Sequence, residues 1–215
     1  MSFWDYVSSR REQLWIETWM HASAVFQCML IATLIGVAVA IATYRSPLAS
    51  RIAIGTTATI LTVPSFALLG LLIPMLGLGV APTVVALVLY ALLPIVRNAI
   101  VGLAGVDPQL VDAARGIGMN RLMILLRIEL PLAWPALLTG IRVSTQMIMG
   151  IAAIAAYVSG PGLGNEIFTG LARLGSKNAI NAAWAGTLGV VLLALLFDAA
   201  YVLLGRLTVP RGIRD

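Results

Sequence analysis

The sequence has 215 residues, of which 60% are hydrophobic and only 11% are charged, and its formal net charge is +5. Soluble domains have about 25% charged residues, so this composition argues against a water-soluble fold. The basic residues form no patch with interleaved aromatics, which argues against nucleic-acid binding. The single cysteine, Cys28, excludes an internal disulfide. The composition predicts an all-α integral membrane protein.

Five apolar runs are expected to cross the membrane as helices, since about 20 apolar residues span roughly 30 Å of hydrocarbon. They cover residues 22–43, 52–76, 82–95, 131–157 and 183–204. Pro64 and Pro74 lie in the second run, where they remove backbone donors, so we expect a kinked helix there. The second and third runs are expected to form a helical hairpin.

The N-terminal segment, residues 1–21, is expected to lie along the outer face of the membrane. Trp4, Trp15 and Trp19 precede the first run at spacings that suit a short interfacial helix, where indole rings are favoured. His21 stands at the expected outer boundary, and an interfacial role is the simplest interpretation.

The positions of the basic residues predict the orientation, because cytoplasmic loops accumulate lysine and arginine. One side collects most of them: Arg45, Arg51, Arg97, Arg115, Arg121, Arg127, Arg206, Arg211 and Arg214. We therefore expect the N-terminus outside and the C-terminus in the cytoplasm. The expected parts are the outer segment 1–21, a transmembrane domain over 22–205 with a cytoplasmic loop at 97–130, and a tail at 206–215.

The cytoplasmic loop contains a predicted short helix at 108–118. Asp107 is a favourable N-cap, and Pro108 suits the first helical position. Gly116 or Gly118 is suited to end the helix in the left-handed conformation. Small alanines on such a helix permit close approach, and its apolar side chains are suited to a partner's groove. The segment has the form of a docking element.

The same loop resembles the cytoplasmic signature of binding-protein-dependent ABC importer permeases, which reads Glu-Ala-Ala, three residues, Gly, nine residues, Ile-x-Leu-Pro. The matching residues are Asp112, Ala113, Ala114, Gly118, Ile128, Leu130 and Pro131. Asp112 is the one departure, since it keeps the charge of Glu on a shorter side chain. The resemblance implies that these seven residues couple the chain to an ATPase.

The resemblance also implies the type I importer permease fold with about five transmembrane helices, and the partners of such a permease. These are a cytoplasmic ABC ATPase dimer, a second permease subunit that is either a copy or a sister chain, and an extracytoplasmic substrate-binding protein. ATP and Mg²⁺ would be bound by the ATPase, so no cofactor, metal site or catalytic residue is expected in this chain. A multi-pass location in a prokaryotic plasma membrane, in contact with lipid, follows.

A wider set of segments resembles the glycine betaine, carnitine and choline permeases. These segments are 63–74, 91–98, 105–108 and 160–164. The resemblance implies an osmoprotectant as the solute. The segments consist of packing and turn residues, which do not themselves recognise a solute. Methionine, taurine or another small solute stays open as an alternative.

Candidate residues for the solute passage are polar or aromatic. They are Ser144, Thr145, Gln146, Tyr90, Tyr157 and Phe66. Aromatic rings attract quaternary ammonium ions through cation–π contacts, although packing and bonds between helices explain the same residues. Arg142 is placed to extend toward the cytoplasmic interface, and Asp198 to pair with a basic group or cap a neighbouring helix.

A secondary transporter or channel is the main alternative from another class. Such a protein would normally show charged relays within spans or two matching halves, and the sequence has neither. A membrane enzyme would need a catalytic constellation, which is also missing. The sequence therefore favours a non-enzymatic permease subunit.

Overall fold

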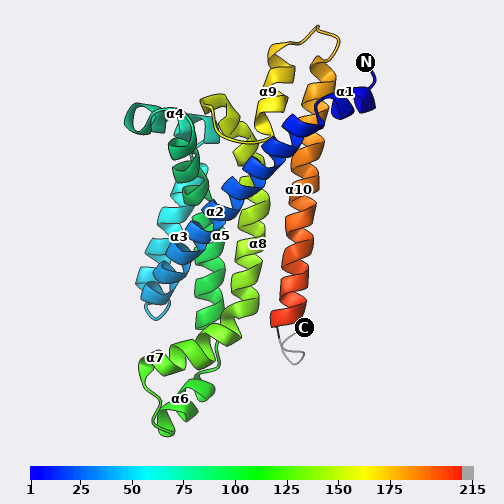
Figure 1. Cartoon of the computed structure of the whole chain (residues 1–215). Helices are drawn as coiled ribbons and strands as arrows, with labels where there is room; N and C mark the ends of the chain where they lie inside the picture. The colour runs from blue at the N-terminus through cyan, green and yellow to red at the C-terminus, as the bar shows by residue number, and fades with distance from the viewer. Residues whose placement is uncertain (210–215) are drawn as a thin grey trace.

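The computed structural model describes residues 1–209, and all regular structure in that range is helical (Figure 1). In chain order the elements are α1 (Phe3–Ser9), α2 (Arg11–Thr43), α3 (Pro47–Thr62), α4 (Ser65–Leu76), α5 (Val80–Ala104), α6 (Pro108–Gly116), α7 (Arg121–Ile124), the π-helix η1 (Leu125–Glu129), α8 (Leu130–Ile154), the 3-10 helix η2 (Ala155–Val158), α9 (Gly164–Ala172) and α10 (Ala179–Thr208). Of the expected tail, Arg211 and Arg214 lie outside the described residues.

The long helices run between two ends of the molecule (Figure 1). The short helices α6 and α7 lie at one end together with the C-terminal end of α10, and we call this the α6 end. The opposite end carries α1, α4 and α9, and we call it the α1 end. The two ends correspond to the two sides of a membrane, and the predicted docking helix lies at one of them.

Four helices, α2, α5, the helical stretch Arg121–Val158 that contains α8, and α10, are long and apolar enough to cross a membrane. The second expected crossing, residues 52–76, corresponds to α3 and α4, which are bent by 93° relative to each other. The expectation of a mere kink was wrong. Because Pro64 disfavours helical geometry in the residue before it, Val63 is extended with φ −67° and ψ 126°, and the helix breaks there.

The first crossing helix begins earlier than expected. Helix α2 is continuous from Arg11, not from residue 22, and its 33 residues make it about 50 Å long. His21 is therefore inside this helix, and it is fully buried. Its Nε2–H donates to the carbonyl of Met149 at 3.1 Å. The expected interfacial position of His21 was wrong, because α2 continues the packed bundle past that point.

Helix α5 extends beyond its expected end at Ile95 to Ala104. Arg97 thus lies within the helix, exposed on its surface, and not at the start of a loop. No proline follows Pro94 within the helix, so the helical backbone continues to Ala104. The side-chain amide of Asn98 donates to the Pro94 carbonyl at 2.8 Å. The irregular part of the expected loop 97–130 is correspondingly shorter.

The core lies between α5 and α8, with α2 packed against both. Gly140 of α8 permits this approach, since a Cβ atom there would lie 2.7 Å from the carbonyl oxygen of Pro94 in α5. Small residues at helix crossings are the usual way in which membrane helices come close. Helix α10 packs against α8 and α9, and has few buried residues.

Candidate functional site

The predicted docking helix exists as α6. The side chain of Asp107 accepts a hydrogen bond from the backbone N–H of Gln109 at 2.8 Å, and Pro108 is the first helical residue, as the sequence predicts. The helix ends at Gly116, and Gly118 has a φ of +86°, a conformation that favours glycine. A short, well-capped helix therefore projects from the α6 end of the bundle (Figure 1).

Helix α6 presents most of its side chains to the surface. Leu110 and Ala113 are exposed, and Ile117 just after the helix is 81% exposed. Ala114 is buried against the rest of the chain. Asp112 pairs with Arg115 at 2.9 Å on the exposed side, one turn further along the same helix. Exposed apolar side chains beside small residues are typical of a surface that another protein covers.

The remaining signature residues lie where the loop rejoins the bundle. Ile128 is in the π-helix η1, and Leu130 and Pro131 begin α8. Ile128 and Pro131 line a shallow, mostly apolar hollow together with Leu110 of α6. The structure thus brings the two halves of the sequence signature to one end of the molecule, with α6 next to the start of α8.

Glu129 is a residue that the sequence analysis did not single out. Its carboxylate is buried at the end of η1 and accepts a hydrogen bond from the Tyr44 hydroxyl at 2.7 Å. Arg45 approaches the same carboxylate at 3.2 Å. Burial, and then the hydrogen bond to Glu129, raise the pKa of Tyr44 to about 12. Glu129 therefore ties the end of α2 to the start of α8; its place inside the Ile-x-Leu-Pro motif was the only signal.

The predicted passage residues Ser144, Thr145 and Gln146 make hydrogen bonds within and between helices. Ser144 donates to the carbonyl of Ala91 in α5 at 2.7 Å, and Gln146 donates to the carbonyl of Ala194 in α10 at 3.0 Å. Thr145 bonds to Ile141 in its own helix and to the Tyr201 hydroxyl of α10. Ser144 and Thr145 are fully buried, Gln146 partly. A role in the passage stays a prediction for all three.

The three predicted aromatic residues separate into two sets. Tyr90 is buried, and its hydroxyl donates to the Val63 carbonyl at 2.6 Å, which stabilises the break between α3 and α4. Phe66 and Tyr157 are exposed at the α1 end, with ring centroids 5.2 Å apart. Phe168 of α9 joins them at 6.4 and 6.1 Å, and no sequence signal indicated it. Phe66 meets both other rings edge-on, a favoured geometry of packed aromatic rings, whereas the rings of Tyr157 and Phe168 are tilted by 48°.

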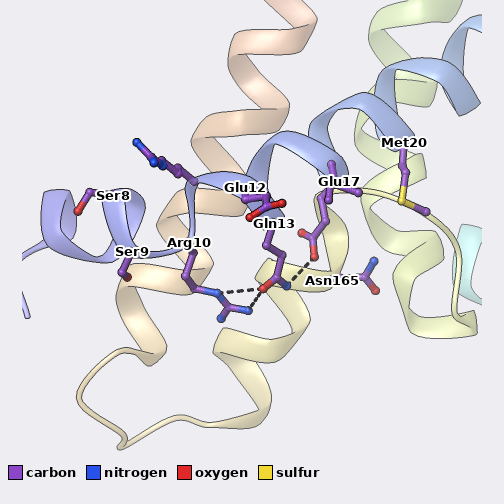
Figure 2. A pocket seen from close by; sticks show the side chains of 10 residues that line it. Ser8, Ser9, Arg10, Glu12, Gln13, Glu17, Met20 and Asn165 are labelled. Carbon is purple, nitrogen blue, oxygen red and sulfur yellow. Dashed lines mark hydrogen bonds between the residues drawn. The ribbon is translucent and has the colours of Figure 1, made fainter.

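A polar hollow lies at the α1 end between α1, the start of α2 and α9 (Figure 2). Figure 2 shows Gln13 between Arg10 and Glu17: Arg10 donates to Gln13, and Gln13 donates to the Glu17 carboxylate at 3.0 Å. Beside it, the buried carboxylate of Glu166 accepts from the Tyr6 hydroxyl at 2.6 Å and pairs with Arg10 at 3.2 Å. These contacts fix α1 and α2 onto α9.

Arg142 and Asp198 form an ion pair between α8 and α10. Arg142 Nε lies 2.6 Å from Asp198 Oδ1, and Nη2 lies 2.7 Å from Oδ2. Pairing with a basic group was one of the two expectations for Asp198, and it is confirmed. The ion pair fixes the Arg142 guanidinium beside α10, and the expectation that this side chain extends toward the cytoplasmic interface stays a prediction.

Comparison with known proteins agrees with this geometry. The family described as "Binding-protein-dependent transport system inner membrane component" matches residues 32–209. The carnitine transport permease protein OpuCB of Listeria monocytogenes is 35% identical, with 94% of this chain and 91% of the relative covered. The choline transport system permease protein OpuBB of Bacillus subtilis is 32% identical over 98% and 95%. The osmoprotectant import permease protein OsmW of Salmonella typhimurium is 37% identical, with 92% of each covered.

Among solved structures, a chain from the inward-facing MetNI methionine ABC transporter matches with a TM-score of 0.78. It is 20% identical, and the match covers 93% of this chain and 99% of that chain. At this level of identity the match shows the fold alone. The helices described above therefore have the arrangement of that transporter chain.

Proposed function

Because the chain belongs to the family of binding-protein-dependent transport system inner membrane components, we propose that it moves a compatible solute such as glycine betaine, carnitine or choline into the cell, driven by a partner ATPase that docks on α6. It is a multi-pass permease subunit of a bacterial membrane, which works with an ATPase and a substrate-binding protein. The observation that carries the coupling proposal is the exposed α6, set between two membrane-crossing helices.

The connection between α6 and α8 gives a route for coupling. Leu110 of α6 lines the same hollow as Ile128 and Pro131. From Arg121 the chain is helical without interruption into α8, with one π-helical turn at Leu125–Glu129. A π-turn inside a longer helix is frequently found at functional sites. A partner that displaces α6 would therefore shift the start of α8, and this is how we expect ATPase movement to reach the membrane.

Glu129 positions this junction. Its carboxylate is held by Tyr44 and Arg45 at the end of α2, so α2 and α8 are tied together next to the π-turn. A displacement of the α8 start would therefore act on α2 as well. Alternating access needs such concerted movement of packed helices, because packed cores switch between arrangements as units.

We place the α6 end in the cytoplasm and the α1 end outside. The α6 end carries Arg45, Arg115, Arg121 and Arg127, which follow the positive-inside rule. The exposed Trp4, Trp15 and Trp19 lie at the other end, where indole rings suit the outer interface. With this orientation the ATPase dimer meets α6, and the substrate-binding protein delivers solute at the α1 end. ATP and Mg²⁺ are bound by the ATPase, and a copy or a sister chain completes the passage.

Uptake by the reconstituted importer tests the function. Proteoliposomes would contain this chain with its cognate ATPase and binding protein, and labelled glycine betaine, carnitine and choline would be offered in turn. We expect ATP-dependent accumulation of at least one, with methionine and taurine giving none. Accumulation of methionine or taurine alone would overturn the solute assignment, and uptake without ATP would favour a secondary transporter or channel.

A further inference from the structure

The exposed face of α8 carries polar groups along the middle of a membrane-crossing helix. The side chains on this face that reach the surface fully or in part are Thr139, Arg142, Val143, Gln146 and Met147. Their spacing of three and four residues places them on one stripe of the helix. On α2, by contrast, large apolar side chains are exposed at Phe26, Leu30 and Leu34.

The contacts of Ile95, near the middle of α5, fix the depth of this stripe. A Cβ atom on Gly140 would lie 3.2 Å from the Ile95 Cα, and a Cβ atom on Gly36 would lie 2.6 Å from the Ile95 side chain. Gly140 of α8 and Gly36 of α2 therefore lie at the same height along α5. Arg142 and Leu34 are each two residues away from these glycines, so both lie close to mid-depth.

The ion pair with Asp198 does not bury Arg142. The two side chains are 44% and 31% exposed, so both charged groups face out of the bundle. An ionised side chain at the bilayer centre costs about 2.5–3.5 kcal/mol on the insertion scale, and such residues face a bundle interior or a water-filled cavity. Leu34 at the same depth is 72% exposed and suits lipid. The α8–α10 face is therefore turned away from lipid.

We propose that Arg142 and Asp198 line the aqueous passage of the assembled importer and bind a zwitterionic solute during transit. The Arg142 guanidinium receives the solute carboxylate through two parallel hydrogen bonds, the favoured geometry for this pair. Asp198 then faces the quaternary ammonium, which has no N–H and is attracted only by charge or by ring faces. The ion pair between Arg142 and Asp198 separates when the solute binds. No charge is left unpaired, because Arg142 then pairs with the solute carboxylate and Asp198 with the ammonium. The proposal rests on the proposed function for the identity of the solute.

Thiol labelling tests whether this face meets water. In a Cys28→Ala background, Thr139→Cys reports on the α8 stripe, and Leu34→Cys is the control near mid-depth on an apolar face. A charged, membrane-impermeant thiol reagent is applied from both sides to the assembled importer in vesicles. We expect Thr139→Cys to react at least tenfold faster than Leu34→Cys. Equal, slow labelling of the two would overturn the aqueous location whatever the solute is.

Uptake of glycine betaine separates solute binding from a static clamp between α8 and α10. Arg142→Gln and Asp198→Asn each leave a lone charge, whereas the double variant has two neutral amides that are able to bond to each other. A clamp predicts that the double variant recovers uptake relative to either single variant. Solute binding predicts that all three fall at least tenfold in maximal uptake rate, while the amount of co-purifying ATPase stays unchanged.

Recovery in the double variant would overturn the binding role. A wild-type importer that takes up no glycine betaine would count against the proposed solute instead, since the labelling contrast does not depend on it. The two failures are thus distinguishable.

Discussion

The hydroxyl of Tyr44 donates a 2.7 Å hydrogen bond to the buried carboxylate of Glu129, which joins the end of α2 to the π-turn that leads into α8. Arg45 adds a second contact to the same carboxylate. This is the point where a movement of the docking helix α6 would first meet the packed bundle. Two predictions concern this junction.

Replacing Glu129 with Gln should weaken the contact between α2 and α8, although the side chain keeps nearly the same shape and one acceptor oxygen. The variant loses the charged contact with Arg45, and we expect a loss of about 1–2 kcal/mol in stability, since hydrogen bonds to charged groups contribute somewhat more than neutral ones. The uptake rate should fall by more than the loss of folded protein accounts for, because coupling passes through this residue. Thermal unfolding in detergent and uptake by the same preparation check this, and wild-type behaviour in both would contradict it.

Ionisation of Tyr44 gives the pH dependence of the same contact. Burial and the hydrogen bond raise its pKa to about 12, from about 10 in an unfolded chain. The neutral hydroxyl is the donor, so its contribution is complete below about pH 10 and is lost as pH rises through about 12. A titration of tyrosinate absorbance, wild type minus Tyr44→Phe, should have a midpoint near 12. A midpoint near the unfolded value would contradict both the burial of Tyr44 and its hydrogen bond to Glu129.

The Tyr90 hydroxyl should stabilise the break between α3 and α4. Tyr90→Phe removes the donor to the Val63 carbonyl, and an unsatisfied buried acceptor costs about 1–3 kcal/mol. Tyr157→Phe is the matched control, because its ring is exposed. In detergent, Tyr90→Phe should lower the midpoint temperature of thermal unfolding and Tyr157→Phe should not. Equal effects of both substitutions would argue against the contact.

The orientation is tested by labelling two exposed positions at opposite ends. In a Cys28→Ala background, Leu122→Cys lies at the α6 end and Ser8→Cys at the α1 end. An impermeant thiol reagent is added to cells from which the cell wall and any outer membrane have been removed. It should label position 8 while the cells are still sealed. Position 122 should react only after the membrane is opened. Labelling of position 122 in sealed cells would reverse the proposed orientation.

Much of the fold was predictable because apolar runs and helix caps are local signals. Asp107, Pro108 and Gly118 specify the ends of the α6 region through their own geometry, so the docking helix could be located from the sequence. Pro64 gave the position of the break but not its 93° angle, which depends on how α4 packs against its neighbours.

Pairings between distant helices could not be predicted. The contact of Arg142 with Asp198 joins residues 56 positions apart, and its geometry depends on how α8 and α10 lie side by side. Glu129 looked like one more charge of a polar loop, since nothing local indicates that Tyr44 and Arg45 would enclose it. Side-chain partners of this kind are set by tertiary packing, which a single sequence does not display.

The most direct test of the account is the binding of the ATPase to a chain altered on α6. Ala113→Glu places a charged side chain on the exposed face of α6, and Ala104→Glu makes the same change at the end of α5 as a matched control. The ATPase that co-purifies from solubilised membranes should fall at least tenfold for Ala113→Glu, together with ATP-dependent uptake, and stay at the wild-type level for Ala104→Glu. Full ATPase binding and unimpaired uptake in the Ala113→Glu importer would contradict docking on α6.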